Sequence, residues 1–242
     1  MNYSIGVIMK VIAVSGTKNT GKTTLVTRIV AELTSRGFSV GTIKHTHHTF
    51  DLEGKDTWKH REAGAEIVVG SGDETFLTVN KNMDLDQLLS MVKFIKNLDF
   101  VVLESFKRCN YAKIATSDIE DEFIITRVNA LEMNEDDVKP IVNLIEERSY
   151  GILQNLDCKK CGFENCTEFA KAVVKGEVKQ GTECKTESDE ILLRVDDRII
   201  PMNFFVQDFV KNAVIGMIKS LKTEEFGVGE GKKIELLIRD KN

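Results

Sequence analysis

Residues 16–24 read GTKNTGKTT and match G-x-x-x-x-G-K-[ST], the pattern of a phosphate-binding loop. The match follows an apolar run, VIAVS at 11–15, and it precedes residues 22–36, whose helical periodicity ends at Gly37. A strand, a glycine-rich loop and a helix in this order let backbone N–H groups and the helix amino terminus face a phosphate group. The sequence therefore predicts a P-loop nucleotide site, since a chance glycine-rich turn would lack these flanks.

Two residues of the loop and one distant acid have predicted roles toward the phosphates and a magnesium ion. Lys22 is expected to reach the β- and γ-phosphates, and the Thr23 hydroxyl to ligate Mg²⁺. Glu104, which ends the apolar run DFVVLE, is the candidate acid on the metal side; the alternative is a carboxylate that merely ends a strand at the surface. The predicted nucleotide-binding residues are Gly16, Thr17, Lys18, Asn19, Thr20, Gly21, Lys22, Thr23 and Thr24.

The bound base cannot be predicted from a motif. A guanine-reading N-K-x-D motif is absent, because NKNMD at 80–84 places its aspartate one residue too late. This stretch is expected to be a loop before a helix.

Strand and helix patterns alternate up to about residue 150, which predicts an α/β fold with a mainly parallel sheet. The continuous apolar run at 99–105 is typical of a buried parallel strand. Further strands are expected at 38–43, 66–72, 75–79 and 122–128, and helices at 84–98 and 135–148.

Two smaller parts are expected after this P-loop domain, which spans residues 1–150. Residues 151–187 are rich in glycine, cysteine and lysine, with one short helix over about 164–175. Residues 188–242 predict a small α+β unit with a hairpin turning at Asp196–Asp197, a long apolar-faced helix at 203–221 and a closing strand at 232–240.

The composition fits a soluble globular protein, with 42% hydrophobic and 29% charged residues in 242. A net charge of −5 argues against a general nucleic-acid binder, and no apolar run is long enough to predict a membrane span. No secretion signal is visible, so a cytoplasmic, reducing location is expected, with translation starting at Met1 or Met9.

All four histidines fall within sixteen residues, in a polar stretch after the second predicted strand. One interpretation is a transition-metal site with nearby aspartates. The favoured interpretation is a loop over the phosphates, with Asp56 or Asp51 near Mg²⁺ and Lys44 or Lys55 near substrate charge; exposed histidines without a role are a third. GKDT predicts a helix that begins at Asp56. The histidines are His45, His47, His48 and His60.

Four of the five cysteines form a candidate metal site with the spacing C-x₂-C-x₄-C-x₁₇-C. In a reducing compartment such clusters are more often metal ligands than disulfides. Four thiolates suit a [4Fe–4S] cluster or structural zinc, and zinc sites usually pair two C-x₂-C knuckles, so iron–sulfur is favoured. The remaining cysteine, Cys109, is expected to be a packing residue. The candidate ligands are Cys158, Cys161, Cys166 and Cys184.

Taken together, GTKNTGKTTL, IKHTHH, GKDTWKHREAGA and DFVVLESFK resemble the MobB family, GTP-binding proteins of molybdopterin guanine dinucleotide biosynthesis. The resemblance covers roughly residues 10–150. It implies a GTP site with Mg²⁺ near Thr23 and Glu104, weak GTP hydrolysis without an identifiable catalytic base, and a homodimer. It also implies roles for Lys44, His45, His48, Gly54, Lys55 and Asp56.

The implied task is assistance to a molybdenum cofactor guanylyltransferase (MobA-like) that joins GMP to molybdopterin. Three departures from the family pattern affect base and partner contacts more than the phosphate site. Ser105 replaces the glycine of E-G-F-K, and AKIA at 112–115 replaces P-K-I-E. The loop between His48 and Gly54 is shorter than in the family, with Thr49 where an aspartate is common. The cysteine segment resembles a four-cysteine iron–sulfur domain of electron-transfer subunits and corrinoid proteins.

Two alternatives remain for the function. One is a metallochaperone or maturation GTPase for an iron–sulfur or other metal redox enzyme, with the histidines as ligands. The other is a nucleotide-gated redox or binding module in which hydrolysis is incidental.

Overall fold

The computed structural model describes residues 8–178, 182, 184, 191, 193–195, 198–221, 234 and 236. The chain separates into two compact units, Met1–Pro201 and Met202–Asn242. Among the described residues, no helix has the length and apolar character needed to cross a bilayer.

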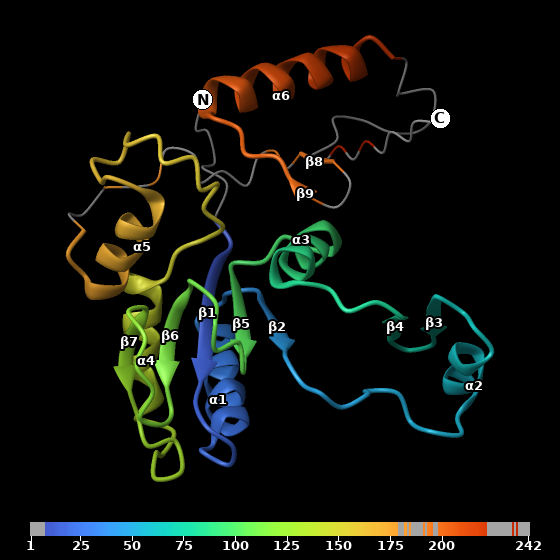
Figure 1. Ribbon diagram of the computed structural model, residues 1–242, viewed down its shortest axis with the longest axis vertical. Coiled ribbons are helices and arrows are strands. Elements are labelled where there is room, and N and C mark those ends of the chain that lie inside the picture. Colours follow the sequence, from blue (N-terminus) through green and yellow to red (C-terminus); the bar gives the residue numbers. More distant parts are fainter. Residues whose placement is uncertain are drawn as a thin grey trace. The chain divides into compact units, whose positions relative to one another are not determined.

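The first unit is built on a five-stranded parallel sheet with the order β2-β5-β1-β6-β7 (Figure 1). Each pairing is parallel, and Val14 of the central strand lies opposite Glu104 on one side and Ile114 on the other. The predicted α/β fold with a mainly parallel sheet is confirmed. The strands are β1 (Lys10–Ser15), β2 (Val40–Lys44), β5 (Phe100–Glu104), β6 (Ala112–Ala115) and β7 (Ile124–Arg127).

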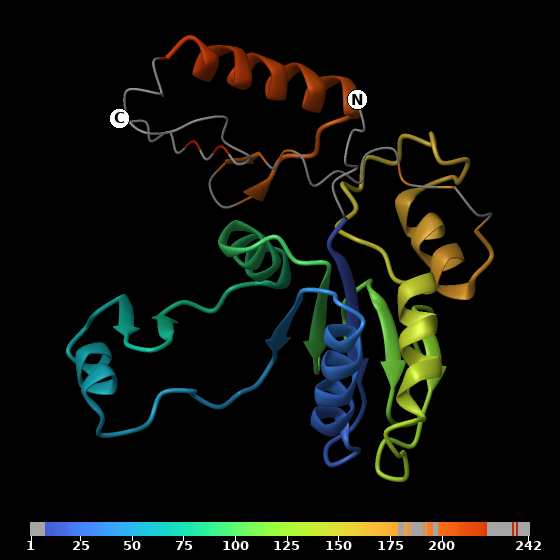
Figure 2. The ribbon, with the colours of Figure 1, turned by 180° about the vertical axis from the view of Figure 1, so that it is seen from behind.

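Helices cover both faces of this sheet because side chains alternate along the strands. Ile12 and Val14 of β1 belong to the core that contains the buried residues of α1 (Lys22–Ser35) and α4 (Val138–Arg148). Figure 2 shows these two helices on the same side of the sheet. Val11 and Ala13 point into the second core, to which α3 (Leu85–Ile95) contributes Leu89.

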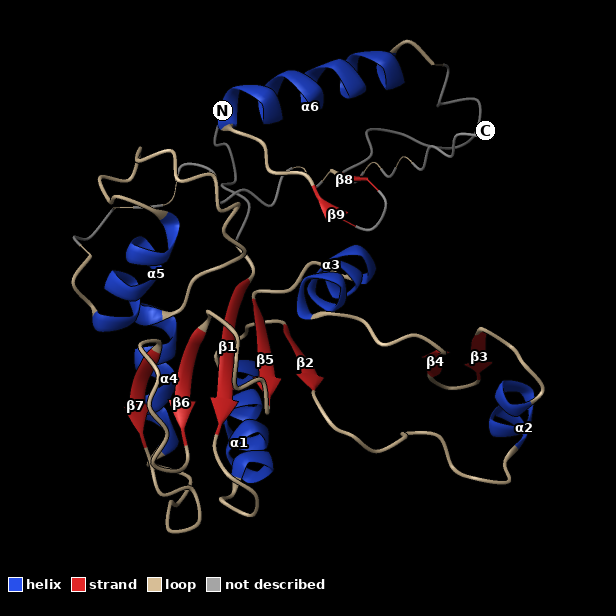
Figure 3. Ribbon diagram, viewed as in Figure 1, coloured by secondary structure: helices blue, strands red, loops and turns tan. Residues whose placement is uncertain are grey.

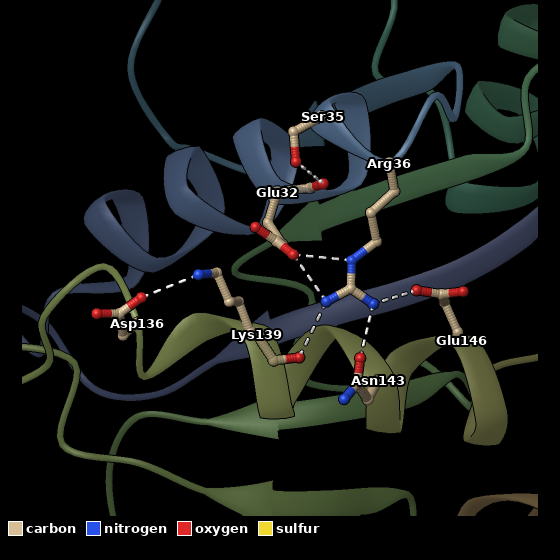
Figure 4. A network of polar contacts seen from close by, with 7 residues as sticks. All are labelled: Glu32, Ser35, Arg36, Asp136, Lys139, Asn143 and Glu146. Carbon is tan, nitrogen blue, oxygen red and sulfur yellow. Dashed lines mark hydrogen bonds and ion pairs between the residues drawn. The ribbon is translucent and has the colours of Figure 1, made fainter.

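Arg36 connects the end of α1 to α4 (Figure 4). Its guanidinium donates to Glu32 Oε1 at 2.8 Å, Asn143 Oδ1 at 2.7 Å and the Lys139 carbonyl at 3.2 Å, and it pairs with Glu146. A planar group with several fixed donors suits such a junction, because it satisfies acceptors on two helices at once. This network fixes how α4 packs beside the P-loop helix.

A separate hairpin with a short helix is inserted between β2 and α3. Strands β3 (Ile67–Ser71) and β4 (Thr75–Val79) pair antiparallel, as the sequence predicted, and α2 (Asp56–Glu62) begins at the expected residue. Figure 3 shows the strand pair beside α2. The next helix, α3, starts at the predicted cap: Asp84 accepts the Gln87 N–H at 2.8 Å in a capping box.

The predicted short helix of the cysteine segment is α5 (Cys166–Lys175). It packs on α4 and β7, and its buried Ala170 and Val174 belong to the same hydrophobic core as the P-loop helix. Lys171 pairs with Glu122 at 2.7 Å. The predicted boundaries at 150 and 187 stay predictions, whereas the packing makes α5 part of the core of the first unit.

The last elements agree with the predicted pattern where the structure describes them. Strands β8 (Arg194–Val195) and β9 (Arg198–Ile199) form the expected antiparallel hairpin. In the second unit, α6 (Phe204–Lys219) is capped by Asn203, whose Oδ1 accepts the Val206 N–H at 3.1 Å. The strand predicted at 232–240 lies outside the described residues.

Candidate nucleotide site and cysteine loop

The carboxyl ends of the parallel strands meet at one edge of the sheet and bring the predicted metal-side residues together. Glu104 Oε1 accepts a hydrogen bond from Thr23 Oγ1 at 2.8 Å and pairs with Lys44 Nζ at 2.9 Å. Glu104 is only 7% exposed, so it is no ordinary surface carboxylate. A hydroxyl and a carboxylate side by side are oxygen ligands that suit Mg²⁺, and the residues present therefore fit this ion.

The P-loop has the backbone that its sequence requires. Asn19 and Gly21 adopt positive φ, 62° and 76°, and the loop leads into α1 at Lys22. A Cβ on Gly21 would lie 3.0 Å from the Ala130 side chain, so a glycine is needed for this close approach as well. The Lys22 ammonium donates to the Thr17 carbonyl and thus lies over the loop.

Two hydroxyl residues at the carboxyl end of β6 hold the loop from the other side, and sequence reasoning missed both. Ser117 Oγ accepts the Thr17 N–H at 3.0 Å, and the hydroxyls of Thr116 and Thr20 lie 2.6 Å apart. A Cβ on Gly16 would lie 2.2 Å from Thr116 Oγ1, which explains why the first loop position is glycine. The available signal was a polar pair, TS, directly after the short run AKIA.

Positive charge is concentrated around Glu104. Burial lowers the pKa of Lys22 from its ordinary value, Glu104 raises it, and the ammonium groups of Lys107 and Lys44 lower it further; the net pKa is lowered. Lys107 is part of the stretch DFVVLESFK, but no pattern in the sequence predicted a role for it. Lys22, Lys44 and Lys107 also line one cavity together with Gly16.

Three of the four histidines lie at the carboxyl end of β2 or in the loop that follows it. The His45 N–H donates to the Glu104 carbonyl at 3.0 Å, and its ring lies 5.4 Å from the Phe106 ring. Exposed His47 and His48 line the same cavity as Lys22 and Lys44.

The GKD part of the predicted loop lies at the start of α2 instead. Gly54 has φ 82°, Lys55 is the residue before the helix, and Asp56 pairs with Lys59 at 3.2 Å. The ion pair of Asp56 is thus formed within α2, and its predicted role toward Mg²⁺ stays a prediction.

The cysteine segment is a tightly turned loop followed by α5. Asn155, Asp157, Lys159 and Gly162 all have positive φ, and Asp157 Oδ1 accepts the Cys166 N–H at 2.8 Å. All five cysteines are free thiols.

Two of the four candidate cysteine ligands are buried and interact. These are Cys166 and Cys184. Burial raises the pKa of Cys166, and the neighbouring Cys184 adds to the rise. Four free thiols are donors of the type and number that a metal cluster requires. Within the described ranges, however, no three metal-ligating side chains converge at any site, the histidines included.

Comparison with known proteins matches the P-loop part and the cysteine segment of the chain to two different families. Residues 11–129 match the family described as "Molybdopterin guanine dinucleotide synthesis protein B", MobB, and residues 153–185 match one described as "Putative Fe-S cluster". A protein of Methanocaldococcus jannaschii is 34% identical over 95% of this chain and 97% of its own length. The chain belongs to the MobB family. That relative is described as a "Putative molybdopterin-guanine dinucleotide biosynthesis adapter protein".

Other MobB relatives match the first part of the chain. The "Molybdopterin-guanine dinucleotide biosynthesis adapter protein" of Haemophilus influenzae is 37% identical over 43% of this chain and 60% of its own. The crystal structure of Bacillus subtilis MobB aligns with a TM-score of 0.44 and 20% identity, covering 56% of this chain and 97% of the other. The family matches at residues 11–129 and 153–185, together with the Methanocaldococcus jannaschii relative, confirm the family-level resemblance inferred from the motifs and the fusion to an iron–sulfur family segment.

Proposed function

We propose that the protein is a GTP-binding accessory protein of molybdopterin guanine dinucleotide biosynthesis. The observation that carries the proposal is membership of the MobB family over nearly the whole chain, combined with a P-loop beside the Thr23–Glu104–Lys44 cluster. In this proposal the protein assists a MobA-like guanylyltransferase that joins GMP to molybdopterin in the cytoplasm.

Each residue group has a role in this proposal. The backbone N–H groups of residues 16–24 and Lys22 hold the phosphates, while Thr23 and Glu104 supply oxygen ligands for Mg²⁺, which neutralises phosphate charge when bound. Slow GTP hydrolysis belongs to the proposal without a named catalytic base. Lys44 pairs with the metal-side carboxylate, and His45 is fixed beside it through its backbone.

Nucleotide binding is tested first. Titration with GTP, GDP and ATP should give saturable binding with a preference for guanine nucleotides. Lys22→Ala should lose at least about tenfold in GTP affinity, since a charged contact to phosphate contributes about 1.5–3 kcal/mol. Lys139→Ala, at a surface lysine of α4, is the matched control. A wild-type protein that binds no guanine nucleotide would overturn the proposal.

The accessory role is tested with the purified guanylyltransferase and molybdopterin. Adding the wild-type protein and GTP should increase the yield of guanylated cofactor, and adding Lys22→Ala should not. Equal yields with the wild type, with the variant and without either protein would remove this function, even if nucleotide binding were observed.

A [4Fe–4S] cluster on the four cysteines is the second part of the proposal, with structural zinc as the competing assignment. The cluster would supply a site for electron transfer or for sensing redox state, and this chain's residues would supply four thiolates. Protein purified without oxygen should contain about four irons per chain, with matching sulfide. One tightly held zinc without iron or sulfide would decide for zinc.

A homodimer is proposed from the exposed face of the β3–β4 hairpin. Ile67, Val69 and Leu77 are 59%, 59% and 44% exposed, and the pairing of Val69 with Leu77 places all three on one face. The opposite face has the buried Val68 and packs on α2. A two-stranded sheet is marginal by itself, so an apolar face of this kind suits burial against a second copy.

The dimer is tested by light scattering after gel filtration. The wild type should have twice the mass of the chain, and Val69→Glu should shift it to one chain. Asp73→Lys, in the exposed turn of the same hairpin, is a control for a charge change alone. A wild type that stays monomeric at micromolar concentration contradicts this part of the proposal.

A further inference from the structure

The loop that follows Glu104 presents a lysine from a rigid backbone. The Ser105 N–H donates to the Val14 carbonyl at 3.1 Å, and Ser15 Oγ donates to the Phe106 carbonyl at 3.3 Å. Lys113 Nζ donates to the Lys107 carbonyl at 3.2 Å. The main chain is therefore fastened on both sides of the Lys107 side chain, directly beside the strand that leads into the P-loop.

Lys113 can hold the loop because its own charge is neutralised. It is 1% exposed, and its ammonium pairs with Asp121 and lies 5.7 Å from the Phe123 ring centre. A buried lysine in such surroundings has few alternative positions, so it fixes the loop rather than following it. The position of the Lys107 backbone is thus set by the core.

The Lys107 side chain, by contrast, is exposed and lines the cavity that also contains Lys22 and Lys44. Within the part of the chain that the structure describes, its ammonium has no carboxylate partner. Lys44 is paired with Glu104, and Lys22 lies over the P-loop. Lys22, Lys44 and Lys107 therefore place three ammonium groups on the wall of one cavity, and Lys44 is the one of the three that pairs with a carboxylate among the described residues, which leaves uncompensated positive charge there.

We propose that Lys107, together with Lys44, forms a phosphate subsite next to the one made by the P-loop. The P-loop amides and Lys22 account for one group of phosphates. Lys44 ends β2, Lys107 lies in the loop after β5, and both are outside the motif. The ligand is a phosphate group, either the terminal phosphate of a bound nucleoside triphosphate or the phosphomonoester of a second ligand.

The inference rests on the proposed nucleotide function and deepens it, because it assigns a residue that selects among phosphorylated ligands. An anion held by Lys107 and Lys44 offsets the repulsion that their two ammonium groups exert on Lys22, which favours binding. A lysine is suited to this task as a mobile point charge on a fixed backbone.

The test compares four proteins by calorimetric titration: the wild type, Lys107→Gln, Lys107→Arg and the surface control Lys139→Gln. Each is titrated with GTP and with GDP, and its GDP-loaded form is titrated with inorganic phosphate. If the γ-phosphate is the ligand, Lys107→Gln should lose about tenfold or more in GTP affinity and change GDP affinity by less than about twofold. If a separate phosphomonoester is the ligand, GTP and GDP affinities should stay unchanged while phosphate binding to the GDP-loaded protein is lost. Lys107→Arg should retain most of the wild-type affinity in either case.

The subsite is overturned if all affinities equal those of the wild type, if GTP and GDP binding fall in parallel, or if the surface control loses as much affinity as Lys107→Gln. Each of these outcomes leaves the nucleotide site itself intact if the wild type binds GTP. A wild type that binds neither nucleotide overturns the nucleotide function and the subsite with it.

Discussion

Replacing Val174 by alanine should destabilise the nucleotide-binding domain, although Val174 belongs to the cysteine segment. Val174 is 1% exposed on α5 and lies in the same core as Val142 and Ile145 of α4. The substitution removes two carbon groups at about 0.8 kcal/mol each and leaves a cavity, for a total of about 2–3 kcal/mol. In a domain of this size, that loss corresponds to a decrease in Tm of roughly 4–12 °C.

The assay follows thermal unfolding with two probes, far-ultraviolet circular dichroism and the fluorescence of a bound nucleotide analogue. Both probes should report the same decrease, because α5 shares its core with the P-loop helix. Lys175→Ala, at an exposed position of the same helix, should change stability by no more than about 0.5 kcal/mol. The opposite result is a separate transition at lower temperature in circular dichroism that Val174→Ala shifts, while the nucleotide fluorescence keeps the wild-type Tm. In that case α5 unfolds independently of the P-loop helix, and the shared core is refuted.

Three further substitutions have expected results. Gly16→Ala should lower GTP affinity at least about tenfold in titration, because its Cβ would lie 2.2 Å from Thr116 Oγ1, and Thr116→Ala in the same chain should restore part of it. Arg36→Ala should lower the free energy of unfolding, measured with guanidinium chloride as denaturant, by about 1–2 kcal/mol, because it leaves acceptors on two helices without their donor. An unchanged free energy would mean that water replaces the hydrogen bonds of Arg36. Asp157→Ala should lower the retained iron per chain during gel filtration, because the carboxylate that accepts the Cys166 N–H is removed; unchanged iron content would assign Asp157 no part in holding the site.

The central sheet was largely predictable because its strands are continuous apolar runs between helical patterns. The exception is β6, which was not predicted as a strand. Its four residues contain Lys113 in the middle, and a lysine normally interrupts a buried strand pattern. The charge is accommodated only through Asp121 and the Lys107 carbonyl, partners in the two loops that flank the strand.

The candidate site was predictable to the extent that its residues belong to motifs. Thr23, Glu104 and Lys44 were predicted from the P-loop, the buried strand and the stretch IKHTHH, which begins within β2, and the structure brings the three together. Thr116 and Ser117 were missed because they reach the P-loop only through the pairing of β6 with β1, about 100 residues earlier in the chain. A strand order of this kind is a tertiary property, and no local pattern encodes it.

The shared core of α5 and the P-loop helix leads to one more prediction. A ligand that binds only the folded chain stabilises it by RT ln(1 + [L]/Kd), about 2.7 kcal/mol at a hundredfold excess over Kd. If nucleotide and metal cluster both bind the first unit, each should raise the same Tm, because one cooperative transition includes both sites. The control is the variant with all four candidate cysteines replaced by serine. Its Tm should still rise when nucleotide binds, and the rise caused by the cluster should be lost.

Additivity distinguishes shared stability from communication between the sites. Independent sites add their increments in free energy, whereas a coupling free energy appears as an excess or a deficit and must be the same whichever ligand is added first. The contact route for such coupling exists: α5 packs on β7, and the loop after β7 places Ala130 against Gly21 of the P-loop. If nucleotide stabilises cluster-loaded and cluster-free protein by the same free energy, the two sites share one folded unit and are not coupled. A difference in GTP affinity between the two forms would show that the cysteine loop regulates the nucleotide site.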